Sequence, residues 1–166
     1  MDVTVTSHRI EIEKAAEEAI ERALEAIGIQ CESHAKANVN AAGRSRHGAS
    51  GLQGHITHQV VDSEKAVYVG SNLEYAVYNE VGTGIYAEGG GGRKGWWVYV
   101  AGESKRNNNG KTYSYDEAKR IVAILKSRGL DAHMTQGMKP IHFLKKAVEE
   151  HVDEYKKIVE EQLKNG

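Results

Sequence analysis

The sequence predicts an α+β fold, in which a small, mostly antiparallel sheet is flanked by long N-terminal and C-terminal helices, with an inserted strand–helix–strand piece. Two observations predict this class. Apolar residues recur at helical spacing near both ends, over 10–39 and 140–163. Between them, short apolar runs are separated by polar or glycine-rich turns, which is typical of antiparallel strands. At 166 residues the chain is long enough for one domain with a substantial core, so we expect a single domain over 1–166.

The N-terminal helix is predicted over 10–27. Gly28 is expected to end or interrupt it, because glycine is common just beyond the C-terminus of a helix. The same apolar face continues in a second piece. The residues on this face are Ile12, Ala16, Ile20, Ala23 and Ile27, followed by Cys31, Ala35 and Val39.

The next segments predict a β-hairpin followed by a short helix. Residues 52–61 alternate in polarity, and a polar DSEK turn leads to AVYVG (66–70), so the two runs form a hairpin. The short helix is expected over 75–81, with its tyrosines packed on the sheet, and Gly82 and Gly84 end it.

A run of four glycines, Gly89–Gly92, follows this helix. Fixing the backbone of one residue costs about 1–2 kcal/mol, and a glycine has no side chain whose burial could offset that cost. Residues 85–95 are therefore expected to be mobile in the isolated chain and to fold on contact with a neighbour, as an assembly arm.

The C-terminal half predicts strand, helix, strand and helix in that order. GWWVYVA (95–101) is a strand, 116–128 is an amphipathic helix closed by Gly129, and LDAHMT (130–135) is a second short strand. The single proline, Pro140, suits the first turn of a long final helix.

Charge and composition exclude several classes of protein. The 22 basic and 23 acidic residues nearly cancel, so the chain as a whole does not attract nucleic acid. A single cysteine, Cys31, excludes an internal disulfide and fits a reducing cytosol. No apolar run approaches the roughly 20 residues that cross a bilayer, and the N-terminus does not resemble a signal peptide, so no membrane association is expected.

Candidate catalytic and cofactor motifs fail on position or spacing. VGTGIYAEGG follows a predicted helix, whereas a dinucleotide-binding loop follows a strand and opens a helix. His55 and His58 are expected to point to opposite faces of a strand. His142 and His151 lie more than two helical turns apart, and no HExxH motif occurs. The sequence therefore predicts no catalytic residues, no cofactor and no metal site, and a protein that is not an enzyme.

A candidate partner surface lies around the two adjacent tryptophans. Trp96 and Trp97 follow each other on a strand, so one of them is expected to face outward. An outward tryptophan beside Arg93 and Lys94 suggests a surface that binds a partner. Further basic residues in loops could face DNA. These residues are Arg44, Arg46, Lys105 and Arg106.

Two strings, SNLEYAVYNEVGTG (71–84) and GMKPIHFLKKAVEE (137–150), resemble a family of phage tail components. This is the tail-completion or head–tail joining family typified by gene product ten of the lambda-like phage HK-ninety-seven. The family string Tyr-Ala-x-Tyr-x-Glu-x-Gly-Thr is matched by Tyr75, Ala76, Tyr78, Glu80, Gly82 and Thr83. The family's start of the last helix is matched by Pro140, Phe143 and Leu144.

This chain departs from the family pattern in three places. The usual Pro-Val-Asp-Thr-Gly before the first strand is absent, and two residues separate Pro140 from Phe143. Residues 101–133 look like an insertion into the family pattern.

The resemblance implies a structural virion protein of a tailed phage or prophage, which acts in tail completion or head–tail joining at the neck or upper tail. Its partners would be copies of itself in a ring, tail-tube or neck/connector proteins, and DNA passing through the channel. It would be found in the host bacterial cytoplasm during assembly and then in the virion. The alternative is a nucleic-acid- or glycan-binding module that uses the Trp96/Trp97 strand and the Arg93/Lys94 loop.

Overall fold

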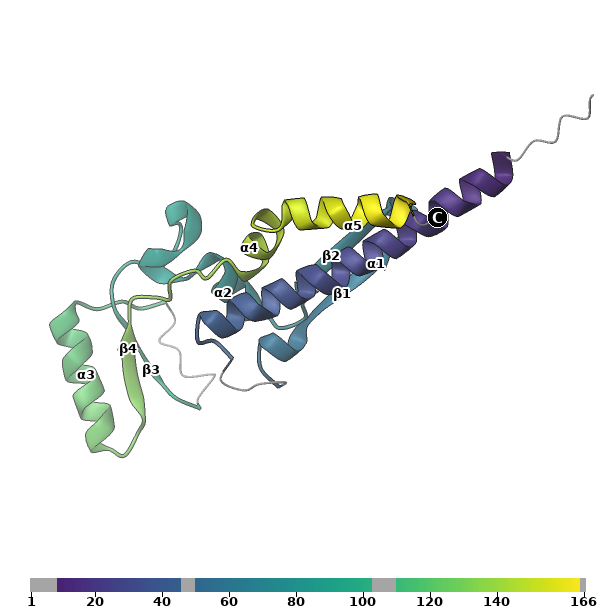
Figure 1. The fold of residues 1–166 in the computed structure, drawn as a ribbon. Coiled ribbons are helices and arrows are strands. Elements are labelled where there is room, and N and C mark those ends of the chain that lie inside the picture. The colour runs from purple at the N-terminus through teal and green to yellow at the C-terminus, as the bar shows by residue number, and fades with distance from the viewer. Residues whose placement is uncertain (1–8, 46–49, 103–109, 165–166) are drawn as a thin grey trace, which may run out of the picture. The chain divides into compact units, whose positions relative to one another are not determined.

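The computed structural model describes residues 9–45, 50–102 and 110–164, with side chains from Lys14 onward (Figure 1). These residues form two compact units. Unit 1 combines the chain up to Leu73 with Phe143 and the residues after it, and unit 2 is the continuous segment Glu74–His142. The prediction of one domain over 1–166 stays a prediction, because two compact units can belong to one domain.

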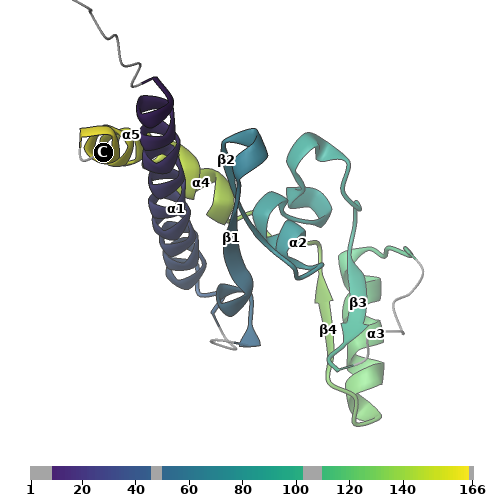
Figure 2. The same ribbon diagram turned by 90° about the vertical axis from the view of Figure 1, so that its right-hand side faces the viewer.

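Unit 1 is built on one long helix. Its elements are α1 (Arg9–Ala41), the antiparallel pair β1 (Ile56–Val61) and β2 (Ala66–Ser71), α4 (Phe143–Glu149) and α5 (Val152–Lys164). Helix α1 contacts the hairpin on one side and α4 and α5 on another, so that it lies between α5 and β1 in Figure 2. Three large side chains at the centre are fully buried: Val39, Ile56 and Phe143.

Helix α1 runs for 33 residues without a break, so the expectation that Gly28 ends or interrupts it is wrong. Gly28 is buried against the hairpin. A Cβ atom at this position would lie 2.4 Å from Cδ2 of His58 and 2.9 Å from Cγ2 of Val67. The close approach of helix and hairpin therefore requires a glycine here. The packing that this glycine allows offsets its low helix propensity.

The C-terminal helix is also different from the prediction. It starts at Phe143 rather than at Pro140, and a turn at 150–151 divides it into α4 and α5. The hydroxyl of Tyr155 donates a 2.6 Å hydrogen bond to the carbonyl of Ala147, across this turn. The amide of Asn38 on α1 donates to the carbonyl of Phe143, which fixes the first turn of α4.

Unit 2 holds the second strand pair. Its elements are α2 (Ala76–Val81), β3 (Trp97–Val100), α3 (Tyr115–Ser127) and β4 (Ala132–Thr135), with two 3-10 turns at Gly84–Tyr86 and Glu88–Gly90. Strands β3 and β4 are antiparallel, with Trp97 opposite Thr135 and Val100 opposite Ala132. Helix α3 covers this pair, and Ala118 and Ala132 are fully buried. Ser114 and Glu117 form a reciprocal capping box that begins α3.

The predicted α+β class with antiparallel strands and long flanking helices is confirmed. Within the described residues, however, the four strands form two separate pairs rather than one sheet. The strand–helix–strand piece is present as β3, α3 and β4. No helix in the described parts of the chain combines the length and apolar character needed to cross a membrane.

Candidate functional site

The two strings that carry the phage-family resemblance meet in unit 2 through backbone hydrogen bonds. Thr83 N–H donates to the carbonyl of Met138 at 2.9 Å, and Met138 N–H donates to the Thr83 hydroxyl at 2.9 Å. Ile85 N–H donates to Gln136, and Ile141 N–H donates to Asn79. Residues 79–85 therefore run alongside 136–142, although more than 50 residues separate them in the sequence.

Glycines make this close approach possible. Gly82, Gly84 and Gly137 all have positive φ angles, of 75°, 63° and 131°. A Cβ on Gly84 would lie 1.8 Å from the carbonyl oxygen of Gln136, and one on Gly137 would lie 2.0 Å from that of Thr83. The Gly-Thr-Gly string is thus a packing requirement rather than a phosphate-binding loop.

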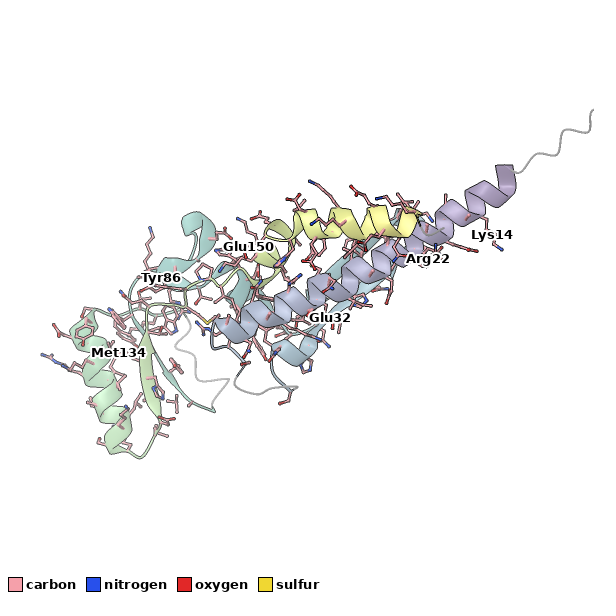
Figure 3. The ribbon with its side chains drawn as sticks, in the orientation of Figure 1. Lys14, Arg22, Glu32, Tyr86, Met134 and Glu150 are labelled. Carbon is pink, nitrogen blue, oxygen red and sulfur yellow. The ribbon has the colours of Figure 1, made fainter. Side chains whose placement is uncertain are left out.

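The large apolar side chains of this segment point outward. Tyr75 is 43% exposed and Tyr78 is 53% exposed, whereas Ala76 and Asn79 are buried. The expectation that the tyrosines pack on a sheet is therefore wrong: the small side chains of α2 face inward and the large ones do not. We name the exposed set the motif surface. It consists of Tyr75, Val77, Tyr78, Ile85 and Tyr86 (Tyr86 is labelled in Figure 3).

The other residues matched to the family string have structural partners. The carbonyl of Glu80 accepts a hydrogen bond from His142 N–H. Pro140 and Leu144 are half-buried, and Phe143 is fully buried in unit 1. Phe143 therefore belongs to the core rather than to a surface available for assembly.

Trp96 and Trp97 are both half-buried, and Trp97 lies on the same side of β3 as the exposed Tyr99, opposite the buried Val98. Trp96 packs edge-on against Tyr115, with ring centroids 5.3 Å apart. The guanidinium of Arg93 lies over the ring of Trp97, 4.9 Å from its centroid. Arg93 and Trp97 line a pocket of about 230 Å³ with Thr83 and Gly84. This volume is below the roughly 300 Å³ at which small-molecule sites begin.

Only one of the four glycines in the run Gly89–Gly92 is closely packed. Gly92 packs so tightly that a Cβ would lie 2.0 Å from the carbonyl oxygen of Gly84, whereas Gly89, Gly90 and Gly91 have open space around them. The predicted mobility of residues 85–95 stays a prediction. Lys94 is exposed, as is Arg44, whereas Arg46, Lys105 and Arg106 lie outside the described residues.

A polar cluster that the sequence did not predict joins α1 to the start of α5. Nε2 of His34 lies 3.0 Å from Oε2 of Glu154, and Nδ1 of His151 lies 3.2 Å from the same oxygen. The two imidazole rings are stacked, with centroids 3.4 Å apart and planes 8° apart. The His-x-x-Glu spacing of 151 and 154 was visible in the sequence, but nothing there pointed to His34 as the third member.

The buried thiol of Cys31 lies beside this cluster. Burial raises the pKa of Cys31, and its hydrogen bond with the Tyr155 hydroxyl opposes that shift only in part. Burial also raises the pKa of Tyr155, and the hydrogen bond with Cys31 adds to the effect. Both groups are therefore neutral near pH 7 and serve as packing and hydrogen-bonding groups rather than as nucleophiles.

A second histidine network joins the hairpin to α1. Nδ1 of His58 lies 2.6 Å from Glu32 (labelled in Figure 3), and its Nε2 lies 3.2 Å from Glu25. The hydrogen bond to Glu32 raises the pKa of His58 against the opposing effect of burial. Burial acts to raise the pKa of Glu32, but hydrogen bonds from Lys36 and His58 bring it below its ordinary value. His55 lies in the 3-10 turn before β1 rather than on the strand.

Comparisons with known proteins return nothing that bears on these sites: no protein-family model matches the chain, and neither a curated protein nor a solved structure matches it significantly.

Proposed function

We propose that the protein is a structural component of a tailed phage or prophage that assembles through the motif surface, acting in tail completion or head–tail joining at the neck or upper tail. It forms a homo-oligomeric ring and binds tail-tube or neck/connector proteins. Assembly takes place in the host bacterial cytoplasm, and the protein is then carried in the virion. The phage assignment rests on the resemblance of residues 71–84 and 137–150.

The observation that carries the proposal is the outward direction of the motif surface. Tyr75 and Tyr78 are each about half exposed, so covering them would remove roughly 100 Å² of surface each from water. At about 25 cal/mol per Å² this corresponds to about 5 kcal/mol for the pair, before the entropy of association is subtracted. Tyrosine is enriched at protein interfaces because its body is apolar and its hydroxyl can still reach a partner or water.

The hydrogen bonding of the same segment also suits assembly. Residues 79–85 are fixed to 136–142 by at least four backbone hydrogen bonds, so Ile85 and the end of α2, next to Tyr78, are held in place before a partner arrives. A surface fixed in this way loses little conformational entropy on binding. Head-to-tail contact between this surface and a different surface of the next copy closes a ring when the rotation between copies allows it.

Sedimentation velocity over a range of protein concentrations tests the proposal. The wild-type chain is expected to self-associate, and Tyr78→Ser is expected to shift the population toward monomer. Tyr68→Ser is the matched control, because Tyr68 is 56% exposed on β2 in the other unit. Equal self-association of wild type and Tyr78→Ser would contradict the proposed surface.

Co-expression tests the phage assignment separately. The chain is expected to co-purify with a tail-tube or portal-side protein encoded next to it, and Tyr78→Ser is expected to lose that partner. Removing Gly89–Gly91 is expected to leave the stability of the monomer nearly unchanged and to impair ring closure, because these glycines have open space around them. Equal joining by the shortened chain would make the glycines a passive spacer.

The alternative function, binding of nucleic acid or glycan through Trp97 and Arg93, is less well supported. Arg93 already covers the Trp97 ring, so that face is not open for stacking against a base or a sugar. Steeply salt-dependent binding to DNA, lost in Arg93→Ala, would favour this alternative over assembly.

A further inference from the structure

Three side chains from two distant segments of unit 1 bring metal-binding atoms to one place. Nε2 of His34, Nδ1 of His151 and a carboxylate oxygen of Glu154 all lie within 4.8 Å of one another. His34 comes from α1, Glu154 from the first turn of α5, and His151 from the turn just before α5. Two imidazoles and one carboxylate form the donor set of many zinc sites and of the facial triad of non-haem iron proteins.

The distances fit a metal ion after a small movement. In a tetrahedral zinc site with bonds of about 2.0–2.1 Å, neighbouring ligand atoms lie about 3.3 Å apart. Here the nitrogens of His34 and His151 lie 3.0 Å and 3.2 Å from one oxygen of Glu154. The two imidazole planes are now nearly parallel, 8° apart with centroids at 3.4 Å, so at least one ring would rotate for the lone pairs of both nitrogens to converge on an ion. The flexible carboxylate would also move outward by a few tenths of an ångström, on the order of the difference from the ideal spacing.

The backbone holds two of the ligands in register. The carbonyl of His151 accepts hydrogen bonds from the N–H groups of Glu154 and Tyr155, both at 3.1 Å. This fixes His151 and Glu154 three residues apart at the first turn of α5, where side chains at this spacing share a face. The hydrogen bond from Tyr155 to Ala147 anchors the preceding turn.

Solvent can reach the three ligands. Their side chains are 23%, 30% and 41% exposed for His34, His151 and Glu154, so an ion could enter from water and keep a water molecule as a further ligand. The nearby Cys31 is not one of the ligands, because its neutral thiol is buried and hydrogen-bonded to Tyr155.

A second histidine in unit 1, His58, also has carboxylate partners, but their geometry does not suit a metal ion. His58 bonds Glu32 through one ring nitrogen and Glu25 through the other, so its carboxylates lie on opposite sides of the ring. Donor atoms arranged in this way cannot converge on a single ion. At His34, in contrast, both imidazoles face the same oxygen.

We infer that His34, His151 and Glu154 form a binding site for a divalent transition metal, with zinc as the ion that this nitrogen and oxygen donor set fits best. The ion joins α1 to the start of α5 and so reinforces the turn between α4 and α5. This site is independent of the motif surface, which lies in unit 2.

Isothermal titration calorimetry on the tag-free, metal-free chain with ZnCl₂ tests the inference. The wild type is expected to bind one zinc ion per chain, with cobalt giving a visible absorption band at the same stoichiometry. His34→Gln and Glu154→Gln are each expected to weaken zinc binding by more than about 100-fold, beyond the loss of about 10- to 100-fold caused by removing an outer-shell partner. Circular dichroism establishes that each variant is folded.

Three controls keep the inference falsifiable. Cys31→Ala and His58→Gln are expected to bind zinc as the wild type does. His133→Gln, which removes a histidine paired with Asp131 in the other unit, is expected to do the same. Failure of the wild type to bind at one equivalent, retention of binding by both ligand variants, or loss of binding only in a control variant would each overturn the site.

Discussion

Replacement of Gly28 by alanine tests the contact between α1 and the hairpin directly. In an ordinary helix interior, Gly→Ala stabilises by about 1 kcal/mol. Here the added Cβ would lie 2.4 Å from Cδ2 of His58 and 2.9 Å from Cγ2 of Val67, so the hairpin or the imidazole ring must move. Overpacking of this kind costs about 1–3 kcal/mol.

Movement of the His58 ring adds a second cost. The ring is fixed by hydrogen bonds to Glu32 and Glu25, and a hydrogen bond to a charged group contributes about 1.5–3 kcal/mol when it is intact. Overpacking and the partial loss of these hydrogen bonds destabilise the variant, and the gain in helix propensity offsets part of that cost. The net destabilisation expected for Gly28→Ala is about 2 kcal/mol. The sign is opposite to that expected for an unconstrained helix.

Urea unfolding followed by far-UV circular dichroism measures this difference, and a lower midpoint with an unchanged slope is expected. The double variant Gly28→Ala/His58→Ala removes the ring that the new methyl group meets. The cost of Gly28→Ala is expected to fall by about 1 kcal/mol or more in the His58→Ala background, with the contact to Val67 remaining. A Gly28→Ala variant as stable as the wild type would refute the packing of the hairpin on this face of α1.

Three further predictions concern pH, the insertion and the glycines. Because the pKa of His58 is raised above its ordinary 6.5 and that of Glu32 is lowered below its ordinary 4.5, the pair stabilises fully between about pH 4.5 and 6.5. This stabilisation is lost as pH rises through the folded-state pKa of His58 or falls through that of Glu32. The urea midpoint of wild type should therefore fall as pH rises above the pKa of His58, and that of His58→Gln should not. Replacing 103–131 by a short Gly/Ser link should leave a folded chain by circular dichroism, because Val100 and Ala132 are already cross-strand neighbours, and global unfolding would place α3 in the essential core. Gly84→Ala should cost about 3 kcal/mol or more in urea unfolding, since its Cβ meets a backbone oxygen at a positive φ, whereas Gly91→Ala should be nearly neutral; equal costs would contradict the tight pairing of 83–85 with 136–138.

Local signals in the sequence predicted most of the secondary structure. The helical spacing of apolar residues over 116–128 was sufficient to predict α3, and the polar DSEK turn was sufficient to predict the hairpin. The class of the fold follows from such local patterns, because each helix and strand must bury one apolar face.

The predictions that were wrong share a physical cause. A local sequence pattern does not show which other part of the protein a side chain packs against. Gly28 has the propensity of a helix terminator, but its role is set by His58 and Val67, which lie on the hairpin. Tyr75 and Tyr78 are apolar enough to be core residues, but the structure buries Ala76 and Asn79 instead and leaves the two tyrosines exposed. The ligands of the proposed metal site could not be grouped from the sequence, because His34 and Glu154 are 120 residues apart.

The division of the chain into units also determines the order in which it can fold during synthesis. Unit 2 is a continuous stretch of sequence, so all of its contacts become available once residue 142 has left the ribosome. Unit 1 is interrupted by it, and the helix that carries Phe143 is made only afterwards. Until then, the side of α1 that contacts α4 and α5, where Cys31 meets Tyr155 and Asn38 meets Phe143, stays uncovered on the nascent chain. A chain truncated before Phe143 would therefore leave part of α1 uncovered. Such a chain is expected to aggregate even if its unit 2 folds correctly.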